Sequence, residues 1–376
     1  MPKLLTAAGA VIATAAMTWA GTAVPSSAQV ASAVTGRASS LRPPTAYVTL
    51  TTVPAVRPIN TATNRPLARI PVGPVPVAIV ITPDGRTAYV SNGSGLTPIH
   101  TATNTPGTPI RGGGGNPIAI TPDGKTVYCV GLDTVTPVHT ATNTAGTPIF
   151  VGRDPGAIAI TPNGKRVYVV NNRFGTVITI NTATNKRGKT IHVGQNPRFI
   201  AITPDGRTAY VASDLGVVTP INIATNTPGT PIGPVSAEAG PIAITPNGKT
   251  AYVVGFDTVT PIHTATNTAG KPIPTGTNNP GAITITPDGT KAYVADFSGK
   301  TVTPISTATN KAGPPIPVAG EPEQIAITPN GKTAYVITAG GGRDGRHTVT
   351  PITTATNKAG PPILAGRGAS AIAITP

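Results

Sequence analysis

Tyrosine recurs through this sequence at a nearly constant interval, and that interval limits the possible fold more than any other feature. All eight tyrosines lie 39 to 42 residues apart, at positions 47, 89, 128, 168, 210, 252, 293 and 335. An Ala-Thr-Asn tripeptide follows each of them further along the chain. A period near 40 residues with several short strands in each unit is typical of β-propeller blades, whereas leucine-rich solenoids repeat about every 20–29 residues.

One repeat, residues 241–276, shows how such a unit divides into strands. Short alternating runs of Ile, Val, Ala and Thr are separated by turn sequences, and Asn-Gly or Asp-Gly supplies the chemistry that a tight hairpin needs. The expected strands are Ile242–Thr245, Ala251–Val254, Thr258–Ile262 and Lys271–Pro274, with turns at Pro246–Lys249 and Thr264–Asn267. Each repeat therefore predicts four antiparallel strands.

The composition supports an all-β protein. Hydrophobic residues make up 39% of the chain and charged residues 11%, with 43 Gly and 43 Pro. So many turn-forming residues argue against long amphipathic helices. The recurring Val, Ile and Tyr argue against disorder, because short alternating runs of these residues can bury one face of a strand.

The repeat also resembles a known family. Val169–Asn172 and Ile180–Asn185 are the closest matches to the YVTN-family repeat of surface-layer and other exported bacterial β-propellers, and the resemblance extends from Tyr47 to Pro376. It implies a propeller fold and says little about activity. Related propellers with this kind of repeat include secreted binding scaffolds, lactonases, and domains of redox enzymes that hold haem or quinone-derived cofactors.

The two ends of the repeat region are complementary. The first unit begins at a second strand, Ala46–Thr49, and the sequence stops after an isolated first strand, Ala371–Thr375. If these two segments pair, eight four-stranded blades close the ring and no sheet edge stays open around it. Seven blades with a spare repeat, or a sequence cut in the middle of a repeat, are the alternatives.

Proline recurs in the third strands (Pro98, Pro137, Pro220, Pro261, Pro304, Pro351) and in the fourth (Pro109, Pro148, Pro231, Pro272). On an outer fourth strand, proline discourages edge-to-edge aggregation. In the third strand it removes a ladder donor, so the seam between strands three and four should be weak. The copy Thr176–Ile180 has no proline and is predicted to belong to the most regular blade.

The N-terminal residues have the pattern of a secretory signal. Lys3 precedes the mostly apolar stretch Leu4–Ala20, and Ala31–Ala33 or Ser26–Ala28 offers a small-residue cleavage site. We expect a signal peptide at 1–33, a linker at 34–45 and the propeller at 46–376, in a secreted or cell-wall-associated protein without a stable membrane span after cleavage. An uncleaved membrane anchor is the alternative.

The single cysteine, Cys129, excludes a disulfide and a multi-cysteine metal site. It occupies a position that other repeats fill with Val, so we expect a small apolar core residue.

Candidate binding residues fall into two groups. Variation between repeats is concentrated in the loops that lead into first strands and join second to third strands, so specific recognition should lie there. These variable-face candidates are Arg153, Asp154, Arg173, Phe174, Arg198, Asp257, Phe297, Glu321, Glu323, Arg343, Asp344, Arg346 and His347.

The opposite face, with the Pro-Asp-Gly and Ala-Thr-Asn turns, carries sixteen basic residues against four acidic ones, within an overall net charge of +15. Such a surface suits a repetitive polyanion through many weak contacts. The candidate polyanion-binding residues are Lys165, Arg166, Lys186, Arg187 and Lys189. Lysines that only keep an exported protein soluble are the alternative.

No chemistry is recognisable in the spacing of polar residues. Asp133, Asp214, Asp257 and Asp296 recur after second strands, where one Asp per blade more often caps its own loop than binds a cation. We therefore expect no metal, no cofactor, no nucleic acid and no enzyme, but a non-catalytic extracellular scaffold that binds a protein or an anionic envelope polymer. A propeller enzyme of lactonase, lyase or quinoprotein-like type is the alternative.

Overall fold

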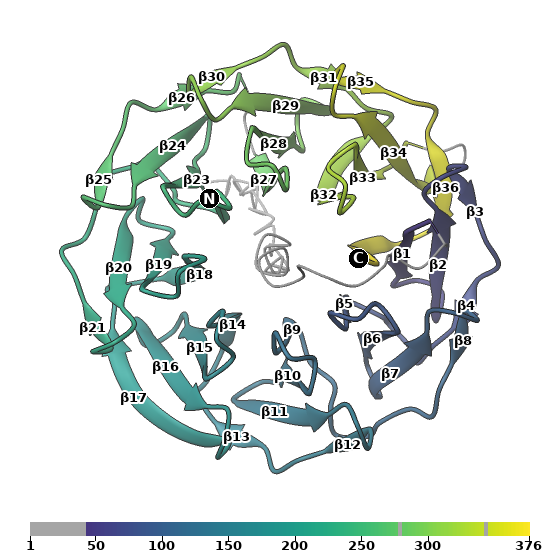
Figure 1. The fold of residues 1–376 in the computed structure, drawn as a ribbon, viewed down its shortest axis with the longest axis horizontal. Helices are drawn as coiled ribbons and strands as arrows, with labels where there is room; N and C mark the ends of the chain where they lie inside the picture. The colour runs from purple at the N-terminus through teal and green to yellow at the C-terminus, as the bar shows by residue number, and fades with distance from the viewer. Residues whose placement is uncertain (1–42, 277–279, 342–344) are drawn as a thin grey trace, which may run out of the picture.

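Eight antiparallel sheets stand in a ring in the computed structural model of the protein, which describes residues 43–276, 280–341 and 345–376 (Figure 1). The prediction of eight blades is confirmed, and the seven-blade alternative is wrong. The described residues contain no helix that is long and apolar enough to cross a membrane.

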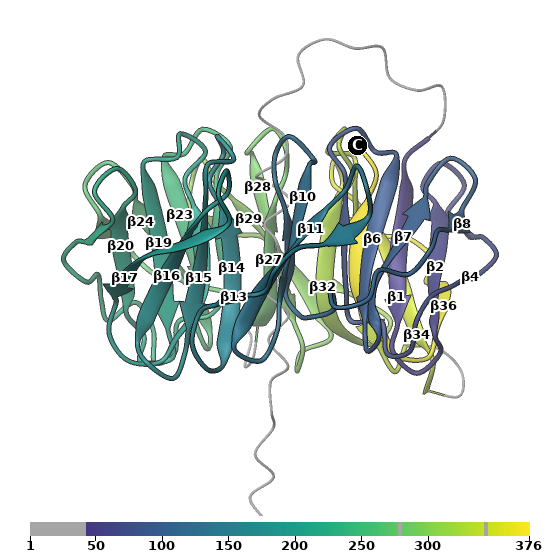
Figure 2. The same ribbon diagram turned by 90° about the horizontal axis from the view of Figure 1, so that it is seen from below.

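Each blade runs outward from an innermost strand, and Figure 2 shows the strands standing roughly along the axis of the ring. The innermost strands, in blades 1 to 8, are β37 (Ala369–Ile374), β5 (Ala78–Ile81), β9 (Ile118–Ile120), β14 (Pro155–Ile160), β18 (Pro197–Ile202), β22 (Ile242–Ile244), β27 (Pro280–Ile285) and β32 (Glu321–Ile327). The second strands are β1 (Thr45–Leu50), β6 (Thr87–Asn92), β10 (Thr126–Val130), β15 (Arg166–Asn171), β19 (Thr208–Ser213), β23 (Thr250–Val254), β28 (Lys291–Asp296) and β33 (Thr333–Ala339).

The third strands are β2 (Ala55–Asn60), β7 (Gly95–His100), β11 (Thr134–His139), β16 (Thr176–Asn181), β20 (Val218–Asn222), β24 (Thr258–His263), β29 (Thr301–Ser306) and β34 (His347–Thr353). The fourth strands are mostly broken into short pieces: β3 (Arg65–Pro66) and β4 (Ile70–Pro71), β8 (Thr105–Pro106), β12 (Thr144–Ala145) and β13 (Ile149–Phe150), β17 (Lys186–His192), β21 (Thr227–Pro228), β25 (Thr268–Ala269) and β26 (Ile273–Pro274), β30 (Lys311–Ala312) and β31 (Ile316–Pro317), β35 (Lys358–Ala359) and β36 (Ile363–Gly366).

The ring closes through its terminal strands, as predicted. In blade 1, β37 pairs antiparallel with β1, with Val48 opposite Ile372 and Ala46 opposite Ile374. The side chains of Val48 and Leu50 are fully buried beside Ile337 and Val349 of blade 8. The last strand thus supplies the inner edge of the first blade.

The apolar core lies between blades rather than at the centre of the ring. One cluster joins Tyr47 and Val56 of blade 1 to Ile79 and Val90 of blade 2, and the same arrangement recurs around the molecule. Cys129 is a fully buried member of one such cluster, and burial raises the pKa of its thiol. The prediction that Cys129 is an apolar core residue is confirmed.

A hydrogen bond from each tyrosine to the next blade explains why tyrosine and Ala-Thr-Asn recur together. Every tyrosine is almost completely buried, and its hydroxyl donates over 2.5–2.8 Å to the Asn side chain of the neighbouring Ala-Thr-Asn turn. We call this contact the Tyr–Asn latch. The eighth latch, from Tyr335 to Asn64, joins blade 8 to blade 1. Each latch asparagine has a positive φ of 51–56°, a conformation that Asn tolerates better than most residues.

The third-strand prolines weaken only the outer seam. Tyr128 lies opposite Pro137, whose carbonyl points outward and accepts from the amide of Gly146 over 2.7 Å. Because a strand residue directs its N–H and C=O to the same side, the missing donor of Pro137 also faces outward, and the inner ladder is intact. The fourth strand of blade 3 accordingly breaks into β12 and β13. In blade 4, where Thr179 replaces proline, β17 is one strand of seven residues, but its pairing with β16 shifts register between Ile178 and Ile180. The copy without proline therefore has the longest outer strand, and the prediction that it forms the most regular blade is wrong in register.

Candidate functional site

The two faces of the ring differ in how their backbone turns are built. The turn face, at the top of Figure 2, carries the Asp-Gly or Asn-Gly turns and the Ala-Thr-Asn turns. The loop face, at the bottom, carries the connections between second and third strands and those that enter each innermost strand. Candidate residues lie on both faces.

Each inner turn on the turn face is fastened by one side-chain oxygen. Asp84 Oδ1 accepts from the Thr82 hydroxyl over 2.6 Å and from the Arg86 amide over 3.0 Å. Asn163 accepts in the same way from Thr161 and from the Lys165 amide. Asp and Asn are therefore interchangeable as turn fasteners, although only Asp adds a negative charge.

Whether a turn has Asp or Asn determines whether the Lys or Arg that follows has a carboxylate beside it. Arg86, Lys125 and Arg207 each lie 3.8 Å from the Asp of their own turn, in exposed ion pairs that contribute little energy. Lys165, Lys249 and Lys332 follow Asn instead, and their exposed side chains have no carboxylate in the turn. We call these three residues the Asn-turn lysines.

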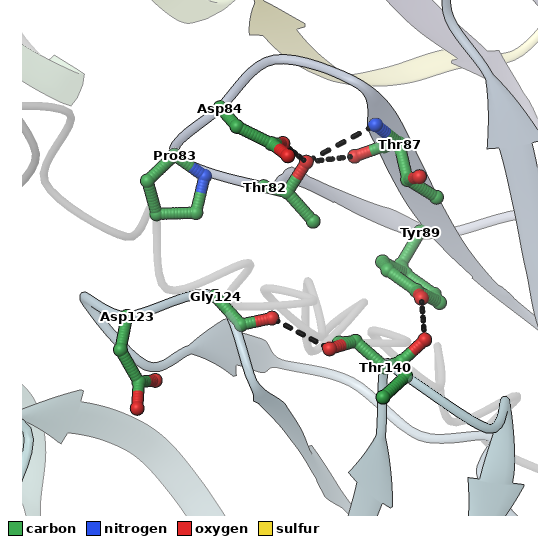
Figure 3. Close-up of a pocket in the computed structure, with 9 residues that line it drawn as sticks. Thr82, Pro83, Asp84, Thr87, Tyr89, Asp123, Gly124 and Thr140 are labelled. Carbon is green, nitrogen blue, oxygen red and sulfur yellow. Dashed lines mark hydrogen bonds between the residues drawn. The ribbon is translucent and has the colours of Figure 1, made fainter.

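A cavity of about 320 Å³ opens on the turn face between blades 2 and 3 (Figure 3). Asp84 and Asp123 line it, together with Tyr89 and Thr140. Tyr89 donates to the Thr140 carbonyl, and the Thr140 hydroxyl donates to the Gly124 carbonyl. The Tyr89 bond joins the two blades, whereas the Thr140 bond fastens blade 3 to its own inner turn.

The two carboxylates of this cavity belong to its turns. Burial acts to raise the pKa of Asp123, but the hydrogen bonds from the Thr121 hydroxyl and the Lys125 amide, with the charge of Lys125, outweigh it and lower that pKa. Asp123 is therefore ionised and committed to its turn at neutral pH, which suits a structural seam better than an acid–base centre.

The predicted polyanion-binding residues lie together on blade 4. Lys165, Lys186, Arg187 and Lys189 are exposed, on the inner turn and along β17. Arg166 is different, because its guanidinium donates over 2.6 Å to the Ile223 carbonyl of blade 5. The half-buried Arg166 therefore ties two blades together. Lys189 also donates to blade 5, over 3.3 Å to the Thr225 carbonyl, but its side chain is exposed like those of Lys165, Lys186 and Arg187.

The variable-face candidates that the structure describes lie on the loop face but do not converge on one point. Arg153 and Asp154 precede β14, Arg173 and Phe174 follow β15, Arg198 lies in β18, Asp257 and Phe297 follow β23 and β28, Glu321 and Glu323 lie in β32, and Arg346 and His347 lie at the start of β34. Arg343 and Asp344 lie outside the described residues.

Several of these residues make contacts with groups close by on the loop face. Arg198 approaches Asp214 at 3.4 Å and lies over the ring of Phe199 at 5.9 Å from its centroid. The Asp257 carbonyl accepts from the amide and hydroxyl of Thr275. His347 Nδ1 accepts from the Gly368 amide over 3.2 Å, and burial lowers the pKa of this histidine.

Two acidic residues on β32 influence each other. Burial, followed by repulsion from Glu321, raises the pKa of Glu323 to about 7. A carboxyl group that titrates near neutrality is able to gain or lose a proton under physiological conditions. No base or nucleophile is hydrogen-bonded to it in the described part of the chain.

Sequence reasoning missed a hollow on the loop face. A cavity of about 680 Å³ lies across blades 2, 3 and 4, lined by Asn92, Asn116, Leu132, Asp154 and the Gly112–Gly115 segment. The glycines admit close packing here, since a Cβ on Gly115 would collide with the Val130 carbonyl. The run of four glycines was the available signal, but it carries no phosphate-binding motif.

Exposed apolar side chains also gather on this face. Leu132 (91% exposed), Phe174, Leu215 and Phe256 occupy the loops between second and third strands of four consecutive blades. Among the described residues, no group of three or more His, Cys, Asp and Glu side chains could hold a metal ion.

Similar folds occur among solved structures. Hydrazine synthase from Kuenenia stuttgartiensis is 22% identical, with a TM-score of 0.59 over 74% of this chain and 96% of that chain. Dihydro-heme d1 dehydrogenase NirN in complex with DHE is 14% identical, with a TM-score of 0.71 over 89% and 77%. A functionally unknown protein from Desulfotomaculum acetoxidans is 21% identical, with a TM-score of 0.59 over 74% and 96%. No protein-family model and no curated protein sequence matches this chain.

These likenesses show a shared propeller fold, and they contradict the prediction that the chain is not an enzyme. Two of the three similar structures are named as enzymes. The prediction relied on the uniformity of the blades, but uniform strands describe the framework alone. Catalytic groups on such a framework lie in loops, which repetition of the strands does not constrain. An active site on the loop face is therefore compatible with this fold.

Proposed function

We propose that the protein is exported and binds an anionic cell-envelope polymer through the turn face. The observation that carries this proposal is the row of Asn-turn lysines, Lys165, Lys249 and Lys332, which are exposed and lack a carboxylate in their own turns. The resemblance of the repeat to that of exported YVTN-type propellers, with the signal-like N-terminus, supports an extracellular location.

The geometry of the ring suits a repetitive ligand. The inner turns of blades 2 to 8 are each held by a Thr–Asp or Thr–Asn fastener, and the Asn-turn lysines lie on every second blade, 4, 6 and 8, so these cations are presented at regular intervals on one face. Phosphate groups repeated along a polymer can engage several of these cations at once, and the summed contacts give useful avidity although each is weak. Teichoic-acid-like or other phosphate-bearing wall polymers have this chemistry.

Retention on isolated, teichoic-acid-bearing cell-wall material across a salt series tests this proposal. We expect retention to fall by roughly tenfold or more between about 0.05 and 0.3 M salt, because screening weakens exposed charge pairs. The triple variant Lys165→Gln, Lys249→Gln, Lys332→Gln should reduce retention at low salt. Arg111→Gln, Arg153→Gln, Arg173→Gln makes the same change in charge on the loop face and should leave retention unchanged. Equal retention of both variants, or retention insensitive to salt, would refute it.

A further inference from the structure

One blade carries an outer strand that differs from all the others. β17 is a single strand over Lys186–His192, with one register shift against β16 between Ile178 and Ile180, whereas the other fourth strands are pieces of two to four residues. It stands at the rim of the ring in Figure 1, and only β16 pairs with it among the described strands. Its outer edge is about 23 Å of extended backbone, given ~3.3 Å per residue.

Elsewhere the same edge is blocked by proline. Thr190 precedes the buried Ile191, and six other blades have proline at the equivalent position: Pro109, Pro148, Pro231, Pro272, Pro315 and Pro362. Blade 1 has Arg69 there. Proline on an edge strand prevents pairing with a further strand, because it removes the donor that the added strand would need. Blade 4 lacks this protection.

The backbone groups of β17 alternate between the sheet and solvent. Val193 donates to the Gly175 carbonyl over 2.9 Å, so its amide points inward. Ile191 is opposite Val177, at the position where Leu96 and Ile110 of blade 2 exchange both hydrogen bonds. Since successive strand residues direct their amides to opposite sides, Thr190 and His192 present their N–H and C=O groups outward.

The side chains along this edge are cationic and exposed. Lys186, Arg187 and Lys189 lie within four residues, and β17 contains no acidic residue. A second copy of the chain pairing at this edge would crowd six cations onto about 23 Å of strand, which opposes self-association. An acidic strand would instead place carboxylates opposite these cations.

We propose that the outer edge of β17 binds an acidic peptide segment in extended conformation, which adds to blade 4 as a fifth strand. Main-chain hydrogen bonds to the outward groups around Thr190 supply the pairing, and Lys186, Arg187 and Lys189 select for carboxylates on the incoming strand. This goes beyond the proposed polymer binding, because it depends on backbone donors and not on the Asn-turn lysines.

Fluorescence anisotropy with the full chain and a labelled eight-residue peptide of alternating Glu and Val tests the proposal. We expect saturable binding that Thr190→Pro weakens by roughly tenfold or more, since this substitution removes an outward donor. Six blades already accommodate proline at this position, so the variant should fold. Thr190→Val keeps the amide and the β-branched shape and should bind as the unaltered protein does.

Two controls separate strand pairing from simple charge attraction. The same peptide with alternate backbone nitrogens methylated keeps every carboxylate but cannot pair, and it should not bind. The triple variant of the Asn-turn lysines should bind the peptide normally, whatever its retention on wall material. Equal binding of plain and methylated peptides, unchanged binding by Thr190→Pro, or no binding of the plain peptide would overturn the proposal. Dimers of the unaltered protein that Thr190→Pro dissociates would also overturn it, in favour of a second copy.

Discussion

The turn face and the loop face of this ring are built from the same strands but follow different rules. On the turn face, one tyrosine and one latch asparagine repeat in every blade, a turn fastener repeats in blades 2 to 8, and each latch joins a blade to the next. On the loop face, the loops between second and third strands differ from blade to blade in length and residues: Gly93-Ser94 in blade 2, Gly131–Asp133 in blade 3 and Asn172–Gly175 in blade 4. The repeated hydrogen bonds between blades thus lie on the turn face, whereas loop-face contacts, such as that of the Ser91 hydroxyl with the Gly115 carbonyl, are particular to one pair of blades.

Removal of the closing strand should cause the largest loss of stability. Deleting Ala369–Pro376 takes away β37, leaves β1 without its inner partner, and uncovers Leu50 and Ala46. We expect the loss to exceed the total stability of the protein, which is of the order of 5–15 kcal/mol for a typical domain. Circular dichroism and size-exclusion chromatography should show an unfolded or aggregated chain.

Deleting Pro376 alone is the control for that truncation, because this residue follows the paired strand. It should leave a cooperative unfolding transition close to that of the full chain. A folded, compact protein after the longer deletion would show that closure contributes little to the ring.

Alkaline pH should destabilise the protein by ionising the tyrosines of the Tyr–Asn latches on the turn face. Burial, as the largest cause, raises the pKa to about 12 for Tyr89, Tyr128, Tyr210, Tyr252, Tyr293 and Tyr335. Because these values exceed the ordinary value of 10, the protonated tyrosines contribute stability that is complete below pH 10 and is lost as pH rises towards 12.

Urea unfolding at pH 9, 10, 11 and 12, followed by the ultraviolet absorbance of tyrosinate, measures this dependence. We expect the unfolding free energy to fall steeply above pH 10, with tyrosinate appearing together with the loss of β structure. Tyrosine ionisation near pH 10 in a protein that keeps its β structure would contradict a protective role for burial in the latch.

A single Tyr–Asn latch should contribute a smaller but measurable part of the unfolding free energy. Asn143→Ala removes the acceptor of the Tyr89 hydroxyl. It also places alanine at φ 52°, a left-handed conformation that alanine tolerates less well than asparagine. We expect a loss of about 2–3 kcal/mol in unfolding free energy, from one hydrogen bond and one strained backbone conformation. Asn143→Gly relieves the strain and should lose about 1 kcal/mol less.

Arg173→Ala on the loop face is the matched comparison, since this side chain is exposed and outside the repeated network. It should change stability by less than about 0.5 kcal/mol in urea or thermal unfolding. If Asn143→Ala were as mild as Arg173→Ala, the latch would have no special role in joining the blades.

The smallest expected effect concerns Glu323 and its pH dependence. Its raised pKa of about 7 means that the neutral form is favoured in the folded protein, so the stability that it contributes is present at low pH and is lost as pH rises through 7. Glu323→Gln should therefore stabilise the protein more at pH 8 than at pH 5. Thermal melts at both values test this, and an equal effect at the two pH values would argue against a raised pKa.

Some of this architecture could be predicted from local chemistry. The spacing of Tyr47 to Tyr335, the turn sequences and the complementary ends sufficed for eight four-stranded blades and for the closing pair of strands. The prolines sufficed for the weak outer seam, because the loss of a donor is a property of the residue itself. The uniformity of the blades was a poor guide to catalysis, because it describes strands and not loops.

Contacts between blades were beyond the reach of the sequence. The eightfold recurrence of tyrosine and asparagine was visible, but only the curvature of the ring brings Tyr335 to Asn64, 271 residues apart in sequence. The same packing ties Arg166 to the Ile223 carbonyl and leaves β17 with an open edge. Period, strand chemistry and turn type are local properties that each repeat carries in its own residues. The adjacent blade in the closed ring decides which side chains join the blades and which are exposed for binding.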